Sequence, residues 1–291
     1  MISERKTEAW VNIIDESIAT DVSRRMNLFL QCGNDFFTAG VLDTDRNKFV
    51  ALLDFRFPFP LYGAELNDKL LSVIESNKPV LDNIYDAVTL GFSGFKNTLV
   101  PDVFFDTDNA EMVFRANHTL EDDEIVRFDK LRRIASKNVY AVPSTLYSFF
   151  NSYYSNLSSY HASTPFVEGI LTQHKNTADT VVSVNLQHTF FEMVVNKGGS
   201  LIFYNQFRYQ TAEDFIYYIV FVYEQLGLNP ETQAVYFSGM MEKNSTLLSM
   251  ARKYIRSTYF MQRPAFCEYS YGFDNLQAHY HFSLYNQFLC V

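Results

Sequence analysis

The chain has 291 residues, of which 47% are hydrophobic, and a formal net charge of −9. This length suits one large domain or two of about 100–150 residues each, and the apolar content can form a core without help from a cofactor. The acidic balance argues against a protein that binds nucleic acid by general electrostatic attraction, because such proteins present a basic face.

The cysteines and the apolar runs bear on the compartment. Cys32, Cys267 and Cys290 are widely spaced and lie in no C-x-x-C motif, so neither a disulfide framework nor a zinc site is indicated. The first ten residues, MISERKTEAW, are charged and precede no apolar stretch. The longest apolar run, FIYYIVFVY at 215–223, has about half of the ~18 residues of a membrane span. We therefore expect a cytoplasmic protein without a membrane span.

A polar N-terminal segment is followed by three alternating runs, MNLFLQC (26–32), DFFTAGVLD (35–43) and NKFVALLDFRF (47–57). Alternation with period two, with turn residues between the runs, predicts a three-strand antiparallel meander. Leu66, Leu70 and Ile74 form a helical stripe in 63–77, and Pro79 follows its end, as expected after a helix. AVTLGF (87–92) is then predicted to be another strand.

The middle of the chain is less regular. DEIVRFDKL (123–131) and NVYAVP (138–143) are predicted to be strands, and a helix is expected at about 143–155. The polar stretch SNLSSYHASTP (155–165) is the expected domain junction. A helix over 163–175 is expected to link the two halves.

The same order of elements then recurs. TVVSVNLQ (180–187), TFFEMVVN (189–196) and SLIFYNQFRY (200–209) predict a second meander. A helix follows at about 211–226, with Thr211 as its cap, and AVYFSG (234–239) is the next strand. A last helix is expected at 244–255, and the apolar tail is expected to pack back on the body. Two such units about 150 residues apart indicate a duplicated architecture.

A duplicated β-β-β-α-β-α unit resembles the actin-like ATPase superfamily, whose halves are ribonuclease-H-like and clasp ATP in a cleft. That superfamily includes actin, sugar kinases, heat-shock chaperones and actin-like subunits of pilus and secretion machines. The whole chain also resembles an uncharacterised Bacteroidetes family with this fold. The resemblance implies an α/β fold with two ribonuclease-H-like halves, residues 1–160 and 161–291, a cleft between them, and a C-terminal segment that packs back on the body.

In that superfamily, the turn between the first two strands of each half carries Asp-x-Gly. Its backbone N–H groups face phosphate oxygens, and its Asp holds the water shell of Mg²⁺. The corresponding residues in the first half are Gln31, Gly33 and Asn34, with a neutral amide in place of the acid. Those in the second half are Asn185, Gln187 and His188, so Asn replaces Asp and Gln replaces Gly.

The third element of the superfamily is a strand that ends in Gly-Gly beside the adenosine. Here Ser238 and Gly239 end the strand, but Met240 stands in place of the second glycine. A side chain at that position crowds a nucleotide. These eight residues of the three elements form the expected nucleotide-binding set, and no catalytic or metal-ligating residue is assigned. No cofactor is expected, with ATP and Mg²⁺ kept as the alternative.

These departures lead to a first hypothesis, a catalytically silent actin-like protein that binds a protein partner or itself and has a degenerate nucleotide cleft. The alternative is an ATPase or a small-molecule kinase with a rearranged site, in which Asp35, Asp54 or Glu192 reaches the cleft. A nucleic-acid role through the basic run 127–137 is the third hypothesis, and the acidic balance speaks against it.

Other patterns are compatible with chemistry but are more simply structural. GFSGF (91–95) is close to a nucleophile elbow at Ser93, yet extended sequence follows it where the elbow needs a helix. His279 and His281 would share a face of an extended strand, although no further ligand completes a metal site. The aromatic clusters at 147–154 and 254–273 are expected to be mostly core, and to bind a partner where they are exposed.

Overall fold

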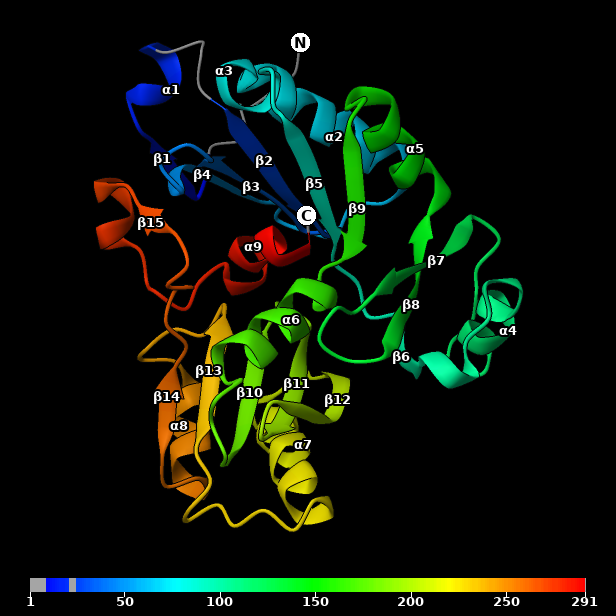
Figure 1. The fold of residues 1–291 in the computed structure, drawn as a ribbon, viewed down its shortest axis with the longest axis vertical. Helices are drawn as coiled ribbons and strands as arrows, with labels where there is room; N and C mark the ends of the chain where they lie inside the picture. The colour runs from blue at the N-terminus through cyan, green and yellow to red at the C-terminus, as the bar shows by residue number, and fades with distance from the viewer. Residues whose placement is uncertain (1–8, 21–24, 291) are drawn as a thin grey trace.

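The computed structural model describes residues 9–20 and 25–290, which form an upper and a lower lobe with a small sheet beside them (Figure 1). Within these residues, the upper lobe holds a seven-stranded sheet, the lower lobe a five-stranded sheet, and the side module a three-stranded sheet. The mixture of sheets with covering helices confirms the predicted α/β class.

The upper sheet has the order β1-β4-β3-β2-β5-β9, and β15 pairs with β4. Its strands are β1 (Val11–Ile14), β2 (Met26–Cys32), β3 (Phe36–Asp43), β4 (Lys48–Arg56), β5 (Ala87–Phe92), β9 (Leu157–His161) and β15 (Glu268–Tyr269). Four helices belong to this lobe: α1 (Ser17–Thr20), α2 (Gly63–Ser76), α3 (Lys78–Leu81) and α5 (Ser144–Tyr153).

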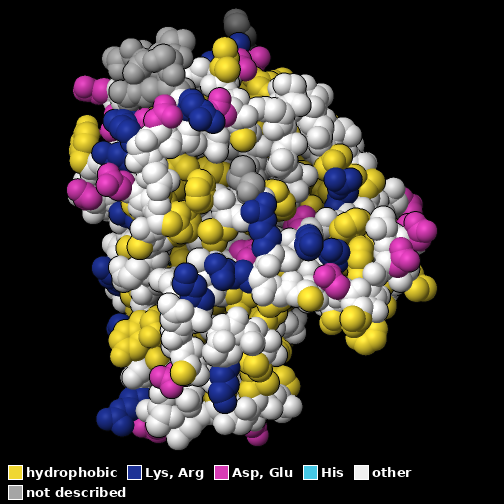
Figure 2. Space-filling view, in the orientation of Figure 1, with side chains coloured by type: hydrophobic (Ala, Val, Ile, Leu, Met, Phe, Trp, Pro, Cys, Tyr) yellow, Lys and Arg dark blue, Asp and Glu magenta, His cyan; other side chains and the backbone are white. Residues whose placement is uncertain are grey.

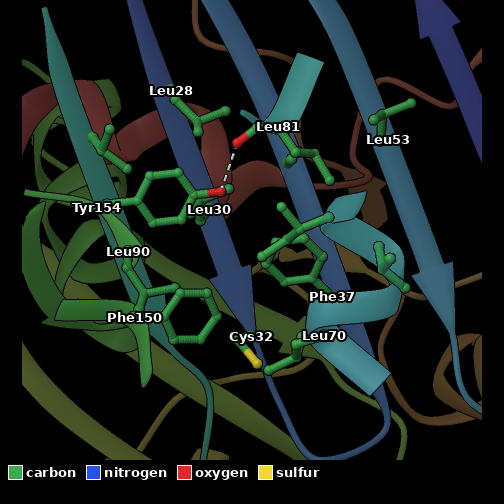
Figure 3. Packing of buried hydrophobic residues seen from close by; sticks show 14 of the residues in the cluster. Leu28, Leu30, Cys32, Phe37, Leu53, Leu70, Leu81, Leu90, Phe150 and Tyr154 are labelled. Atoms are coloured by element: carbon green, nitrogen blue, oxygen red, sulfur yellow. Dashed lines mark hydrogen bonds between the residues drawn. The ribbon is translucent and has the colours of Figure 1, made fainter. Parts of the chain in front are cut away.

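The core of the upper lobe lies between the sheet and helices α2, α3 and α5 (Figure 3). Leu30 and Phe37 from the strands pack with Leu70 and Phe150 from the helices, and all four are fully buried. Each such side chain contributes roughly 1.5–3 kcal/mol by leaving water. The hydroxyl of Tyr154 donates to the Leu81 carbonyl (2.8 Å), so this part of the aromatic cluster at 147–154 is core, as predicted.

The lower sheet has the order β12-β11-β10-β13-β14. Its strands are β10 (Thr180–Leu186), β11 (Phe190–Lys197), β12 (Ser200–Arg208), β13 (Val235–Gly239) and β14 (Thr258–Phe260). Helices α7 (Ala212–Gln225) and α8 (Thr246–Tyr254) pack on it through a shared apolar core. The predicted cap of α7 is present, because the Asp214 N–H donates to the Thr211 hydroxyl (3.0 Å).

The two sheets repeat one another. In each, three strands form an antiparallel meander, and the first of them also pairs in parallel with the strand after the next helix. The predicted duplication is therefore confirmed in element order and in pairing. Helix α6 (Ser163–Gln173) lies between the lobes, where Phe166 and Val167 pack with Val194 of β11 and Phe282 near the C-terminus.

The small sheet has the order β6-β8-β7 and is inserted between β5 and β9. It comprises β6 (Asn97–Pro101), β7 (Glu124–Lys130) and β8 (Ser136–Pro143), with helix α4 (Ala110–Arg115) and the short turns η1 (Asp102–Phe104) and η2 (Thr107–Asn109). Val100, Phe114 and Val139 form a separate core for it. The sequence predicts two of its strands, β7 and β8, but not their assembly with β6 into an independent sheet.

The polar stretch at 155–165 is not a plain linker. Its residues Leu157–His161 form β9, which completes the upper sheet by pairing in parallel with β5. After the lower lobe the chain returns to the upper one through β15, η3 (Tyr271–Asn275), α9 (Phe282–Asn286) and η4 (Gln287–Cys290). Within 9–20 and 25–290, no helix has both the length and the apolar character that crossing a membrane requires.

Candidate functional site

The carboxyl ends of β2, β10 and β13 meet where the two lobes face each other, which is where open α/β sheets usually bind ligands. A small cavity of about 30 Å³ lies there. Four of the predicted residues line it: Gln31, Asn185, Gln187 and Gly239. The other polar or charged groups in its wall are Thr38, Arg56, His281 and Ser283.

The first turn is tight, since the Gly33 N–H donates to the Phe36 carbonyl (3.1 Å). A Cβ on Gly33 would lie 2.6 Å from the Phe36 ring, so this ring fills the space where a ligand would approach the backbone. Asn34 donates through Nδ2 to the Tyr62 hydroxyl (3.0 Å) and accepts from the Leu61 N–H (2.7 Å). The loop before α2 therefore covers the turn.

The second turn has the same form, because the Gln187 N–H donates to the Phe190 carbonyl (2.9 Å). His188 extends from it toward the upper lobe, with Nδ1 3.0 Å from Oδ2 of Asp35. The Asp35 side chain is mostly buried, whereas that of His188 is largely exposed. The two turns thus contact each other directly across the cleft.

Asn185 and Ser238 are hydrogen-bonded within the lower lobe, and Asn185 Nδ2 also donates to the Ser283 hydroxyl of α9 (3.3 Å). The Asn185 amide Nδ2 donates to Oε2 of Glu192 (2.9 Å), its register partner on β11, and its Oδ1 accepts from the Ser238 hydroxyl (3.1 Å). Glu192 also accepts from Tyr204 (3.1 Å) and Gln206 (3.2 Å). All of these side chains except Tyr204 are buried to more than nine-tenths. Burial raises the pKa of Glu192, which the hydrogen bonds partly oppose.

Gly239 and Met240 close the cleft from the side of β13. Gly239 has φ +77°, and a Cβ there would lie 2.2 Å from the Leu186 carbonyl oxygen. This close approach between β13 and β10 requires glycine whether or not a ligand is present. Met240 lines the cavity, and its Sδ lies 3.2 Å from Nη2 of Arg56 in the other lobe.

Each of the three acids that could have replaced the missing Asp has a partner within the protein. Asp54 is fully buried, accepts from Arg56 (2.7 Å) and from the Thr38 hydroxyl (2.9 Å), and lies 3.7 Å from Nε2 of His281. Burial lowers the pKa of His281 to about 4. Asp35 contacts His188, and Glu192 contacts Asn185, Tyr204 and Gln206, as described above.

These groups do not match a site for a hydrated Mg²⁺, which needs carboxylate or phosphate oxygens open to its water shell. No cluster of three or more His, Cys, Asp or Glu suited to a metal occurs among residues 9–20 and 25–290. Sequence reasoning missed Arg56, Thr38 and Ser283 as site residues, and it considered His281 only as a possible metal ligand. Asp54 and Arg56 are two residues apart in β4, so their side chains share one face of the strand. This spacing could have revealed Arg56 as the partner of Asp54.

The other candidates occupy structural positions. Ser93 is followed by β6, so the helix that a nucleophile elbow needs is absent, as predicted. His279 and His281 lie in a turn, so the extended strand on which they would share a face is not formed. His281 has φ +57°, and His279 stacks on Phe260 (4.0 Å between ring centroids).

Figure 2 shows a short band of Lys and Arg across the middle of one face of the molecule. The basic run 127–137 lies wholly within the described residues. Several of its cations contact the protein itself. Arg127 lies 4.9 Å from the Tyr147 ring centroid, Arg133 donates to Thr172 (2.6 Å), and Lys137 lies 3.5 Å from Asp102.

Residues 15–258 match a family described as "Protein of unknown function (DUF3822)". The chain belongs to the DUF3822 family. No similar sequence was found among curated proteins. Of solved structures, a Bacteroides thetaiotaomicron protein with actin-like ATPase fold and unknown function is 22% identical, with a TM-score of 0.75 over 82% of this chain and 91% of that one.

A second similar structure is the PilM–PilN complex of type IV pilus biogenesis, which is 11% identical with a TM-score of 0.61 over 92% of this chain and 99% of that one. At these identities the likeness concerns the fold alone. This DUF3822 chain therefore has the actin-like ATPase fold that its duplicated pattern indicates, and it resembles PilM in fold.

Proposed function

We propose that this DUF3822 protein is a cytoplasmic, catalytically silent binding module, in which the nucleotide cleft of the actin-like fold is degenerate. The observation that carries the proposal is the direct contact of the two turns through Asp35 and His188 over a cavity of about 30 Å³. A drug-sized ligand occupies a pocket roughly ten times larger or more.

The chemistry of the cleft points the same way. A nucleotide triphosphate with Mg²⁺ needs open carboxylates for the metal and free backbone N–H groups for the phosphates. In this chain the Gly33 and Gln187 N–H groups close their own turns, and Asp54 is paired with Arg56. Entry of a triphosphate would have to separate His188 from Asp35 and Met240 from Arg56 across the cleft. A Mg²⁺ ion could use Asp54 only after Arg56 has moved away from it, and breaking such a buried pair is costly.

A protein partner is supported by two observations. PilM, which shares the fold, is found in complex with a protein, PilN. Several large apolar side chains of this chain are strongly exposed, among them Val103, Phe104 and Tyr271, and such side chains favour contact with other proteins when they gather. The reducing cytoplasm is supported by the cysteines, because Cys32, Cys267 and Cys290 are buried and unpaired.

The proposal is tested by following the melting temperature during titration with ATP and Mg²⁺, with phosphate release measured in parallel. We expect no Mg²⁺-dependent stabilisation and no phosphate release. A nucleotide at a hundred times its dissociation constant would stabilise the folded chain by about 2.7 kcal/mol, which this assay resolves. Such a stabilisation together with phosphate release would overturn the proposal.

The alternative is an ATP-dependent enzyme, an ATPase or a small-molecule kinase, whose cleft opens to rearrange the site. Asp54 is the acid best placed for it, since Thr38 and Arg56 beside it line the cavity. If phosphate release is found, Asp54→Asn should abolish it, with Asp45→Asn on an exposed turn as the matched control. Loss in the first variant alone would establish the enzyme.

A further inference from the structure

The outer strands of the two meanders differ in how their edges are covered. In the upper lobe, β4 pairs along its outer edge with β1, antiparallel from Val11 opposite Asp54 to Ile14 opposite Ala51. In the lower lobe, β12 holds the equivalent position at the border of its sheet (Figure 1). No strand from the described ranges 9–20 and 25–290 pairs with its outer edge. The same fold therefore shows one covered edge and one open edge.

The composition of β12 gives this open edge little protection. Natural edge strands are usually blunted by charges, by proline or by bulges. Over its nine residues, SLIFYNQFR, β12 has no proline and one charged residue, Arg208, which lies 4.5 Å from the Phe95 ring centroid. One bulge is present: Ile202, which is 52% exposed, is an extra residue of β12 at the step from Val195 to Asn196 of β11. It lies near the start of β12, so the register of Phe203–Arg208 is unbroken.

An apolar helix face continues the surface beside this edge. Tyr218 of α7 stacks on Phe207 of β12, with 4.9 Å between ring centroids. Tyr217 and Phe221, one turn apart on α7, stack on each other and are 62% and 42% exposed. Aromatic side chains that remain in water beside an open strand are typical of surfaces that become buried on association.

We propose that β12 pairs antiparallel with β12 of a second copy of this chain, which joins two lower lobes into one continuous sheet. This inference rests on the proposed function as a binding module and names its partner. A two-fold axis makes paired identical strands antiparallel, and antiparallel is the direction in which β1 covers β4. Since Arg208 is the only charge on β12, like charges oppose each other only in the register that places Arg208 opposite itself.

The test is sedimentation equilibrium of the full chain over a roughly hundredfold range of protein concentration, since self-association depends on it. We expect a monomer–dimer equilibrium in the wild type. Ile202→Lys introduces a lysine on β12, and lysines on edge strands are a common means of blocking edge-to-edge pairing. This variant should raise the dissociation constant of the dimer at least about tenfold. Ile84→Lys is the matched control, because Ile84 is 91% exposed in the upper lobe, and it should dimerise like the wild type.

A monomeric wild type at every concentration, or an Ile202→Lys variant that dimerises normally, would overturn the proposal. Hydrogen exchange on the wild type provides a second measurement that does not depend on folding of a variant. The backbone amides of β12 should exchange more slowly at high protein concentration, and a dimer without this protection also counts against the proposal. Because none of these outcomes involves nucleotide, failure here is distinguishable from failure of the proposed function.

Discussion

Replacing Asn185 by Asp, the residue of the superfamily pattern, should destabilise this protein strongly. The Asn185 amide donates to Glu192 over 2.9 Å, and both side chains are 2% exposed. Asp at this position would exchange a donor for a second carboxylate. Two unit charges about 3 Å apart repel by about 6 kcal/mol at an effective dielectric constant of about 20. The variant can avoid this repulsion only by taking up a proton.

Holding that proton at neutral pH costs about 1.36 kcal/mol for each unit between pH 7 and the ordinary Asp pKa of about 3.9, or about 4 kcal/mol. We expect Asn185→Asp to lower the free energy of unfolding by this amount at pH 7. The folded pair would have a raised pKa, so its stability is present at low pH and lost as pH rises. The deficit against the wild type should therefore shrink by about 1.4 kcal/mol per unit as pH falls toward about 4.

Urea unfolding of both proteins between about pH 5 and 7 measures this difference and its slope. The exchanged pair, Asn185→Asp with Glu192→Gln, is the matched control, because the new carboxylate can accept from the new amide. It should recover most of the lost stability. An Asn185→Asp variant as stable as the wild type at pH 7, without pH dependence, would show that two acids can occupy this buried pair without an electrostatic cost.

Three further changes test other parts of the structure. Gly239→Ala forces a Cβ to within 2.2 Å of the Leu186 carbonyl oxygen at φ +77°, so the melting temperature should fall by the equivalent of about 2 kcal/mol or more. His188→Ala removes the contact with Asp35; stability should change by less than about 1 kcal/mol, but hydrogen exchange at both turns should become faster, and unchanged exchange would contradict a closing role. Burial raises the pKa of Asp129 to about 7. The stability that the protonated Asp129 contributes is therefore present below about pH 4 and lost as the pH rises to 7. Asp129→Asn should remove this pH-dependent loss of up to about 4 kcal/mol, which urea unfolding at pH 4 and pH 7 measures.

Much of the fold could be predicted because the strands of both meanders alternate apolar and polar residues and are separated by turn residues. The strands β1 and β9 could not be predicted in this way. Residues Val11–Ile14 follow a polar segment, and Leu157–His161 lie in a polar stretch, so neither has a strong local pattern. Each is held by pairing with a strand far away in sequence, β4 and β5 respectively.

The candidate site was predictable only in part, for a similar reason. The duplicated pattern brings Gln31, Asn185 and Gly239 to one place, and the structure has all three around one cavity. The alternation of apolar and polar residues along one strand does not show which residue of the next strand lies opposite. The contact between Asn185 and Glu192 could therefore not be predicted from that alternation. The hairpin register does reveal it, because a turn closed by Gln187 and Phe190 sets residue 185 opposite 192.

Side chains of the protein itself, those of Asp35, His188 and Met240, close the cleft between the lobes. A crystal structure grown with Mg²⁺ and a non-hydrolysable ATP analogue tests this closure most directly. We predict that Asp35 still contacts His188 and that no triphosphate lies between 31–34 and 185–188. A metal-bound triphosphate held between the two turns, with Met240 displaced, would show that the cleft opens and binds nucleotide.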